Sequence, residues 1–118
     1  MNRRANGTEG EFTARDYLIG QGYAILAMNY RRPTGEIDLI AQKKGVVAFI
    51  EVKRRATRRY GTPAEAVTPQ KRLRIVRTAA LFIQENGLED ARLRFDIIEI
   101  TPGEVNHIES AFDATDIY

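Results

Sequence analysis

The feature that most constrains the fold is the stretch GEIDLIAQKKGVVAFIEVKRR, which occupies residues 35–55. It predicts two apolar strands, near 36–42 and 46–53, joined by the two-residue turn Lys44-Gly45. Apolar residues occupy both alternate sets of positions in each strand, so both faces of the hairpin need to be covered. The sequence therefore predicts a β-hairpin at the centre of the domain.

Charged residues gather at the open end of this hairpin, away from the turn. With a two-residue turn, antiparallel pairing sets Asp38 opposite Glu51. It also sets Glu36 opposite Lys53, and these four side chains project from one face. Facing carboxylates repel each other, and a divalent Mg²⁺ or Mn²⁺, which prefers oxygen ligands, would relieve that repulsion. Lys53 would then stabilise developing negative charge or orient a water, which is the chemistry of metal-assisted phosphodiester hydrolysis.

Two alternatives stay open from spacing alone. A bulge at Gly45 would shift the pairing by one residue. The charges would otherwise form a surface salt-bridge cluster, with Glu36 paired to Lys53 and Glu51 paired to a nearby arginine. Regular alternation also places Ile37 on the face away from the carboxylates.

Two other segments carry helix signals. The first begins at Thr8, where Thr8-Glu9-Gly10-Glu11 fits a capping box, and runs to about Gly20. The second spans 68–86, with Thr68-Pro69 at its start and Asn86-Gly87 at its end. The predicted apolar stripe of this second helix consists of Leu73, Val76, Ala80 and Ile83.

Strand-like segments at 23–30 and 92–100 complete the pattern, whereas residues 107–118 follow no clear period. The order helix–strand–hairpin–helix–strand predicts an α/β domain in which helices flank both faces of a central mixed β-sheet. The length of 118 residues suits a single domain, 1–118.

Composition excludes several classes of protein. The chain is 43% hydrophobic and 29% charged and has no cysteine, which rules out disulfides and thiolate metal sites. No run approaches the roughly 18 apolar residues of a membrane span. The N-terminal arginines are not followed by the apolar run of a secretory signal. We therefore expect a soluble, cytoplasmic protein that has no membrane partner.

The net charge of +2 conceals an uneven distribution. Between Lys53 and Arg77 nine residues are basic and one is acidic, whereas nine acids and two arginines follow from Glu85 onward. A basic middle segment suits contact with a polyanion, although solvated helix faces are commonly charged as well. The residues expected to contact a nucleic-acid backbone are Arg54, Arg55, Arg58, Arg59, Lys71, Arg74 and Arg77.

At the hairpin the chain resembles a known enzyme superfamily. Asp38, followed thirteen residues later by Glu51-Val52-Lys53, is similar to the D…ExK core of the PD-(D/E)XK nucleases. Ile37 stands where the name of that superfamily has proline. More closely, the chain resembles the YraN family of uncharacterised bacterial proteins, which is similar to archaeal Holliday-junction resolvases. The matching stretches cover nearly the whole chain: Gly10-Glu11, Ala14, Tyr17-Leu18, Gly22-Tyr23, GEIDLI at 35–40, Glu51-Val52-Lys53, Arg55, Lys71 and Arg94-Phe95-Asp96.

The resemblance implies a restriction-endonuclease-like fold and a metal-dependent endonuclease that cleaves DNA. It implies that Asp38 and Glu51 bind Mg²⁺ or Mn²⁺ and that Lys53 is the catalytic lysine. It further implies that Glu11 is the acid supplied by the first helix. Gln70-Lys71 resembles the Gln or Lys that some superfamily members place beside the metal site.

The residues themselves give Glu11 some support. Glu11, Ala14 and Leu18 follow the i, i+3, i+7 spacing of an inward-facing stripe. The alternative is that Glu11 is only the capping partner of Thr8. His107 and Asp96 are expected to be structural, and Asp96 to pair with an arginine.

Three functional hypotheses remain. The first is a metal-dependent endonuclease acting on the DNA backbone, possible substrates including branched DNA, since no base-reading motif is present. The second is a non-catalytic nucleic-acid-binding module on a nuclease scaffold. The third is a protein-interaction domain that uses its acidic tail. A resolvase-like enzyme that cuts two strands would suit a homodimer, although no dimer element is visible in the sequence.

Overall fold

The computed structural model describes residues 8–56 and 67–114. Its elements are α2 (Glu9–Gly20), β1 (Ala24–Arg32), β2 (Gly35–Lys43), β3 (Val46–Arg54), α3 (Pro69–Asn86), β4 (Arg92–Thr101) and β5 (Glu104–Phe112). Both predicted helices, with their capping residues, and all four predicted strands are confirmed to within two residues at either end. The strand β5 was not predicted.

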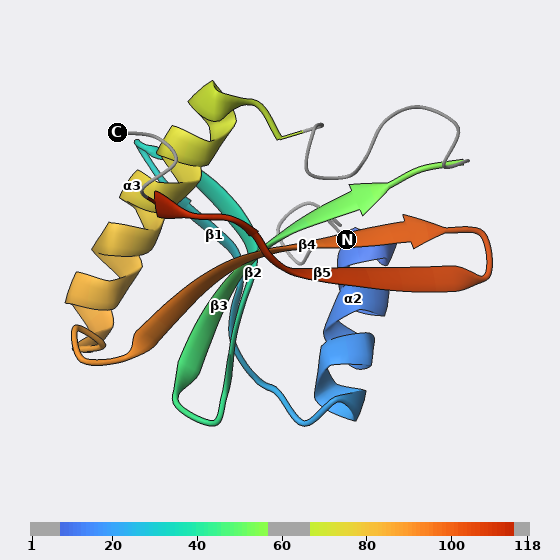
Figure 1. Cartoon of the computed structure of the whole chain (residues 1–118), viewed down its shortest axis with the longest axis horizontal. Helices are drawn as coiled ribbons and strands as arrows, with labels where there is room; N and C mark the ends of the chain where they lie inside the picture. Colours follow the sequence, from blue (N-terminus) through green and yellow to red (C-terminus); the bar gives the residue numbers. More distant parts are fainter. Residues whose placement is uncertain (1–7, 57–66, 115–118) are drawn as a thin grey trace.

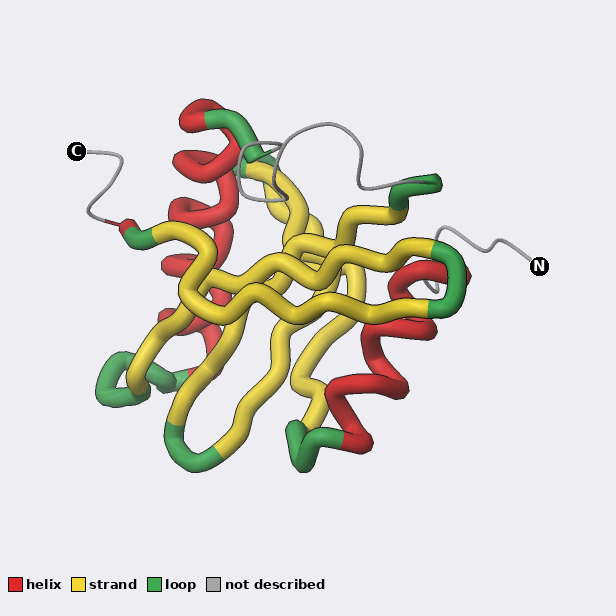
Figure 2. Tube along the Cα trace, turned by 45° about the vertical axis from the view of Figure 1, so that its right-hand side comes forward, coloured by secondary structure: helices red, strands yellow, loops and turns green. Residues whose placement is uncertain are grey.

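The five strands form one mixed sheet in the order β1-β2-β3-β4-β5. β3 and β4 run parallel, and the chain crosses between them through α3. The other three neighbouring pairs are antiparallel. Figure 2 shows that the sheet is strongly twisted, as expected from the right-handed twist of its strands.

The two helices lie on opposite sides of this sheet (Figure 1). On one side α3 places Ile75 and Phe82 in a core that includes Phe49 and Phe95 of the sheet. On the other side α2 contributes the fully buried Leu18 to a second core. The predicted α/β class, with helices on both faces of a mixed sheet, is confirmed, and this is the arrangement of a restriction-endonuclease-like fold.

The β2–β3 turn has the predicted two-residue form. Lys44 and Gly45 both adopt positive φ angles, 50° and 78°, and Lys43 pairs with Val46. This is the backbone of a type I′ turn, which matches the twist of the strands it joins. The register is therefore not shifted by a bulge at Gly45.

The buried face of α3 follows the predicted stripe only in part: Val76 and Ile83 pack against the core. Ala80 is exposed, and the buried residues of the helix are Ile75, Thr78, Ala79 and Phe82. The burial of Thr78 was not predicted, because threonine is polar and does not belong to an apolar stripe. Its burial is made possible by hydrogen bonds of its hydroxyl with Thr34 Oγ1 at 2.7 Å and with the Arg74 carbonyl at 2.8 Å.

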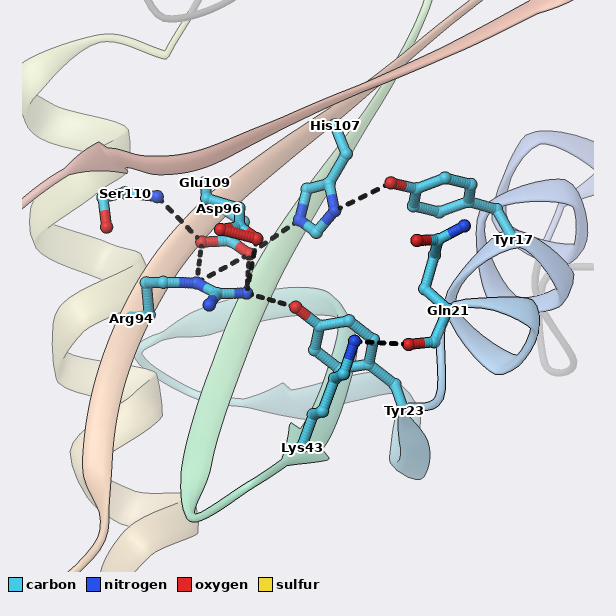
Figure 3. A network of polar contacts seen from close by, with 9 residues as sticks. All are labelled: Tyr17, Gln21, Tyr23, Lys43, Arg94, Asp96, His107, Glu109 and Ser110. Atoms are coloured by element: carbon cyan, nitrogen blue, oxygen red, sulfur yellow. Dashed lines mark hydrogen bonds and ion pairs between the residues drawn. The ribbon is translucent and has the colours of Figure 1, made fainter.

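A polar network on the other face ties α2 to β4 and β5 (Figure 3). Its centre is Asp96, which is completely buried and accepts hydrogen bonds from Arg94, His107 and the Ser110 N–H. Tyr17 of α2 hydrogen-bonds the other ring nitrogen of His107 at 3.3 Å. Asp96 is thus paired with an arginine, as predicted, and His107 connects two elements of the fold.

No helix in the described ranges 8–56 and 67–114 is both long enough and apolar enough to cross a membrane.

Candidate active site

The hairpin strands stop pairing at the candidate site. The last pair of β2 and β3 is Leu39 with Ile50, so Asp38 and Glu51 are the next residues in the register. Beyond this pair Asp38 Oδ2 accepts a hydrogen bond from the Val52 N–H at 2.8 Å. The carboxylate thus satisfies a backbone amide at the point where the ladder ends. The structure brings the two predicted acids together at the open end of the hairpin.

The alternation of side chains changes at the same level of the sheet. Asn29, with a φ of 52°, lies between the pairs Met28–Leu39 and Tyr30–Ile37. Met28 and Leu39 pack on the α2 side, whereas Tyr30 and Ile37 pack on the α3 side. The predicted face of Ile37 is therefore wrong. The regular two-residue period fails where a left-handed residue interrupts β1.

The pKa values of Asp38 and Glu51 shift in opposite directions. Burial, a hydrogen bond to Glu51 and the Glu51 charge raise the pKa of Asp38 to about 9. Burial also favours the neutral form of Glu51, but hydrogen bonds from Asp38 and Lys71 outweigh it and lower the pKa of Glu51. At neutral pH the proton therefore resides on Asp38 and the negative charge on Glu51.

Two lysines lie beside the acidic pair. Lys71, in the first turn of α3, places its Nζ 2.8 Å from Glu51 Oε2. Burial lowers the pKa of Lys53, and repulsion by Lys71 lowers it further. Burial opposes the charge of Lys71 as well, but its bond to Glu51 raises its pKa overall. Lys53 is thus the lysine that more readily gives up a proton.

Glu11 faces inward, as predicted, and is only 8% exposed. Its Oε1 accepts hydrogen bonds from the Thr8 N–H at 2.8 Å and from Asn29 Nδ2 at 3.0 Å. The capping role of Glu11 is therefore confirmed. Its negative charge also contributes to the raised pKa of Asp38, which places it within electrostatic range of the site.

Glu36 does not take the position expected from regular pairing. Its Oε1 lies 3.1 Å from Arg31 Nε and 3.3 Å from Asn29 Nδ2, both on β1. The predicted opposition of Glu36 and Lys53 is wrong because β2 and β3 have separated before this level. The predicted salt-bridge cluster, Glu36 with Lys53 and Glu51 with an arginine, is not the arrangement in the described residues either.

A cavity of about 420 Å³ lies between the hairpin and the start of α3. Its lining residues are Gly35, Glu36, Asp38, Glu51, Thr68, Gln70, Lys71, Arg74 and Ile75. Gly35 has a φ of 151°, and a Cβ at this position would lie 3.2 Å from the Arg74 Cβ and the Thr78 Oγ1. Glycine therefore lets α3 approach β2 closely at the cavity.

The predicted backbone-contacting residues have different surroundings. Arg74 and Arg77 are exposed on α3, whereas Arg55 lies 3.4 Å from the buried Glu99. Arg54 is exposed and pairs with Glu9 at 3.6 Å. Arg58 and Arg59 lie outside the described residues.

The donor set suits a hard divalent cation by its chemistry. Mg²⁺ is commonly held by one or two carboxylates together with waters and phosphate oxygens, and Asp38 and Glu51 supply such a pair. The raised pKa of Asp38 reflects burial beside a negative Glu51, and a divalent cation would relieve this repulsion. Among residues 8–56 and 67–114, however, no group of three or more acidic or histidine side chains is assembled for a metal. The two-carboxylate site thus fits Mg²⁺ or Mn²⁺ as a partial ligand set.

Sequence reasoning missed two residues near the site. Asn29 bonds both Glu11 and Glu36, and the available signal was an asparagine inside an apolar strand, where this residue type is disfavoured. Glu99 is 2% exposed and pairs in register with Lys53. Its signal was an acid flanked by the isoleucines of the run IIEI, residues 97–100.

The protein has an α/β architecture of the restriction-endonuclease-like type. It combines a mixed sheet, a helix on each face of that sheet, and a carboxylate pair at the open end of the central hairpin. The sequence model of the uncharacterised protein family UPF0102 matches residues 10–100. The chain therefore belongs to this family, which is also called the YraN family.

Relatives in the same family match along most of their length. A UPF0102 protein of Symbiobacterium thermophilum is 50% identical over 103 residues, which cover 87% of this chain and 86% of that protein. A UPF0102 protein of Desulfosudis oleivorans is 43% identical over 115 residues, with 95% and 93% covered. One from Clostridioides difficile is 41% identical over 114 residues, with 95% and 100% covered.

Proposed function

We propose that this protein is a Mg²⁺- or Mn²⁺-dependent endonuclease that hydrolyses phosphodiester bonds in DNA, with branched DNA as its preferred substrate. The proposal depends on one observation above all. Asp38 and Glu51 meet at the open end of a hairpin, beside Lys53 and Lys71, and their pKa values shift in opposite directions. Groups with strongly shifted pKa values in a polar cavity are typical of catalytic sites.

Each of these side chains has a role that its surroundings support. Glu51 is ionised and held in place by Lys71, so it would be the first oxygen ligand of a cation. Asp38 would lose its proton when a positive charge arrives beside it. Lys53 would stabilise negative charge on the phosphate or move a proton to the leaving oxygen, because burial lowers its pKa. A bound divalent cation supplies Lewis-acid stabilisation and lowers the pKa of a water.

The start of α3 would receive the phosphate backbone. Helix N-termini favour anions through their unpaired N–H groups and dipole. Gln70, Lys71 and Arg74 of this helix line the same cavity as the two acids. This arrangement would place a phosphate between α3 and the hairpin.

The test is a cleavage assay on branched and linear DNA with Mn²⁺, Mg²⁺ or EDTA. Cleavage should require metal and be lost in Asp38→Ala and Glu51→Ala, which remove the proposed ligands. Glu89→Ala, an exposed acid in the loop between α3 and β4, is the matched control and should cleave normally. Undiminished cleavage by the first two variants would contradict the proposal. Binding of DNA without cleavage under all metal conditions would instead favour the non-catalytic binding module.

A further inference from the structure

The ion pair between Lys71 and Glu51 joins a fixed group to a movable one. Lys71 Nζ lies 2.8 Å from Glu51 Oε2, and the side chain of Glu51 is 8% exposed whereas that of Lys71 is 42% exposed. Glu51 belongs to the sheet strand β3. Lys71 reaches it from the first turn of α3 on a flexible four-carbon stem. If the pair separates, Lys71 is therefore the partner that moves.

The ammonium group of Lys71 contacts a carboxylate that a divalent cation would need. Glu51 is one of two proposed protein ligands, and the other, Asp38, already accepts the Val52 N–H with its Oδ2. Mg²⁺ lies about 2.1 Å from its ligand oxygens and requires a nearly regular geometry around it. A cation on either oxygen of the Glu51 carboxylate would thus be a close neighbour of Lys71 Nζ, and the two positive charges would repel each other.

The charges of the site also favour an exchange of partners. One divalent cation balances the two ionised carboxylates of Asp38 and Glu51, so the charge of Lys71 then becomes surplus. Lys53, which Lys71 repels, adds to this surplus. Lys71 lines the cavity together with Arg74 of the same helix. A lysine that leaves Glu51 therefore stays where a phosphate would be received.

We propose that Lys71 is a built-in counter-ion of Glu51 that a divalent cation displaces, and that the released ammonium group then binds a DNA phosphate at the start of α3. This inference rests on the proposed metal-dependent function and adds regulation of the same site. Because one side chain serves both steps, cation binding and DNA binding would strengthen each other. The exchange needs only Asp38 and Glu51 as protein ligands of the cation.

The first test measures Mn²⁺ binding without DNA at pH 8, by the loss of the free-Mn²⁺ electron paramagnetic resonance signal. Lys71→Met removes the ammonium group and keeps an unbranched apolar side chain. We expect it to bind Mn²⁺ about tenfold more tightly than the wild type, which is the effect of one charge-assisted hydrogen bond. Arg74→Met is the matched control, because it removes another positive charge that lines the cavity. It should change the affinity by no more than about twofold.

Thermal unfolding separates displacement of Lys71 from simple repulsion of the cation. In EDTA, Lys71→Met should be less stable than the wild type, because it deprives the buried Glu51 of this ammonium group. Saturating Mn²⁺ should abolish the difference, since Lys71 then no longer contacts Glu51 in the wild type either. A lysine that kept its contact with Glu51 beside the cation would leave the difference in place.

The contact with DNA is tested by fluorescence anisotropy with labelled branched DNA. A Lys53→Met background removes the proposed catalytic lysine and keeps the DNA intact. In this background Mn²⁺, compared with EDTA at equal ionic strength, should tighten DNA binding about fivefold more when Lys71 is present than in Lys71→Met. Arg74→Met should weaken DNA binding by the same factor in both conditions, because its contact does not depend on the cation.

The inference is overturned if Lys71→Met binds Mn²⁺ no more tightly than the wild type, if its lower stability persists in saturating Mn²⁺, if Mn²⁺ tightens DNA binding equally with and without Lys71, or if the wild type binds no Mn²⁺. A protein that shows the expected exchange but never cuts DNA would refute the proposed function and uphold the inference. Metal-dependent cleavage without the exchange would do the opposite.

Discussion

Asp38 is a residue whose environment works against the stability of the fold. Its pKa is raised to about 9 by burial and by Glu51, whereas an aspartate in an unfolded chain titrates near 4. Between these two pH values the unfolded chain releases a proton that the folded chain retains. Folding stability therefore decreases as the pH rises from about 4 toward 9. A buried carboxyl group that lowers folding stability in this way is expected at a functional site rather than at a position that only supports the fold.

Replacing Asp38 with asparagine should remove this cost. An asparagine oxygen can still accept the Val52 N–H bond, and its amide can donate to Glu51 without titrating. We expect Asp38→Asn to raise the free energy of unfolding at pH 8 by about 1–2 kcal/mol and to abolish cleavage. The gain should shrink as the pH is lowered to 4. Urea unfolding at several pH values measures this, and a variant less stable than the wild type at pH 8 would contradict it.

The residues that sequence reasoning placed correctly are those governed by local rules. The turn chemistry of Lys44-Gly45 fixes the register, and the register brings Asp38 to Glu51. The predicted direction of Ile37 was wrong at the level of the left-handed Asn29, one strand away. The predicted partner of Glu36 was wrong because β2 and β3 have separated at its level. No periodicity within β2 carries that information.

At the level of secondary-structure elements, the position of α3 over β2 depends on Gly35. Alanine there would add a Cβ 3.2 Å from two atoms of α3 and would strain a φ of 151°. We expect Gly35→Ala to destabilise the protein by about 2–3 kcal/mol and to weaken DNA cleavage, because the start of α3 lines the candidate site.

Gly103→Ala provides the control for backbone strain alone. Gly103 has a φ of 76° in the β4–β5 turn, and a Cβ there meets nothing within 4 Å. Its substitution should cost about 1 kcal/mol and leave cleavage intact. Thermal unfolding and cleavage rates of the two variants separate strain from displacement of α3. Equal effects of both variants would show that the close approach of α3 is unimportant.

The Asp96 network holds α2 against β4 and β5. Burial raises the pKa of Asp96, but hydrogen bonds from His107, Arg94 and Ser110 outweigh it and lower the pKa below its usual range. The Asp96 carboxylate is therefore ionised and can only accept hydrogen bonds. His107 must then carry a hydrogen on Nε2 and donate it to Asp96. Stability from this depressed pKa is fully present above about pH 4 and is lost as the pH falls through the folded-state pKa.

Removing Asp96 should be costly, because it leaves Arg94 without its buried partner. We expect Asp96→Ala to lower the free energy of unfolding by about 3–5 kcal/mol at pH 7. Glu109→Ala is the control, since this exposed acid lies 3.8 Å from the same arginine and should contribute no more than about 0.5 kcal/mol. Urea denaturation followed by circular dichroism measures both values. A loss below about 1 kcal/mol for Asp96→Ala would contradict a buried, obligatory ion pair.

The ends of helices and strands were predictable where capping residues or turn residues occupy them. Thr8 and Thr68 cap α2 and α3 as expected, and Gly87 closes α3 in a left-handed conformation. The strand β5 was missed because it is an edge strand with many polar residues. Its pairing with β4 also includes an irregularity in register, which disturbs the two-residue pattern.

Across the whole molecule, the candidate site and the β2–β3 turn occupy opposite ends of the hairpin. Arg74, an exposed arginine of α3, lines the cavity at the site end, and the exposed Arg77 follows one turn later on this helix. The backbone N–H of Arg92, by contrast, bonds the Gly45 carbonyl at the turn end. A DNA backbone that lies along the start of α3 would therefore be contacted by the first two arginines and not by the third.

Salt dependence tests this orientation. Each lost phosphate contact should reduce the slope of log Kobs against log[salt] by about one. We expect Arg74→Ala and Arg77→Ala each to reduce the slope in this way, and Arg92→Ala to leave it unchanged. Fluorescence anisotropy with labelled DNA at 50–300 mM salt gives the slopes. An equal reduction in all three variants would indicate that the DNA does not follow α3.

The architecture and the membership of the candidate site were thus predictable to different degrees. Alternating apolar residues and helix caps were sufficient for the α/β class and for a sheet covered on both faces. The site was predictable where Asp38, Glu51 and Lys53 share one hairpin. Glu51 was expected to need a cation, but its pairing with Lys71 arises from the crossover between β3 and β4. Such a contact depends on tertiary packing that no local pattern encodes.

The pairing of Glu51 with Lys71 has a consequence for the order of folding. Two carboxylates at the open end of an isolated hairpin repel each other, so the strands can close from the Lys44-Gly45 turn but not at their far end. Closure there awaits the arrival of α3, whose lysine compensates Glu51. Pulse-labelling hydrogen exchange should accordingly protect the amide of Val52, which bonds Asp38, later than amides beside the turn. A nascent chain would then complete its candidate site only after α3 has packed against the hairpin.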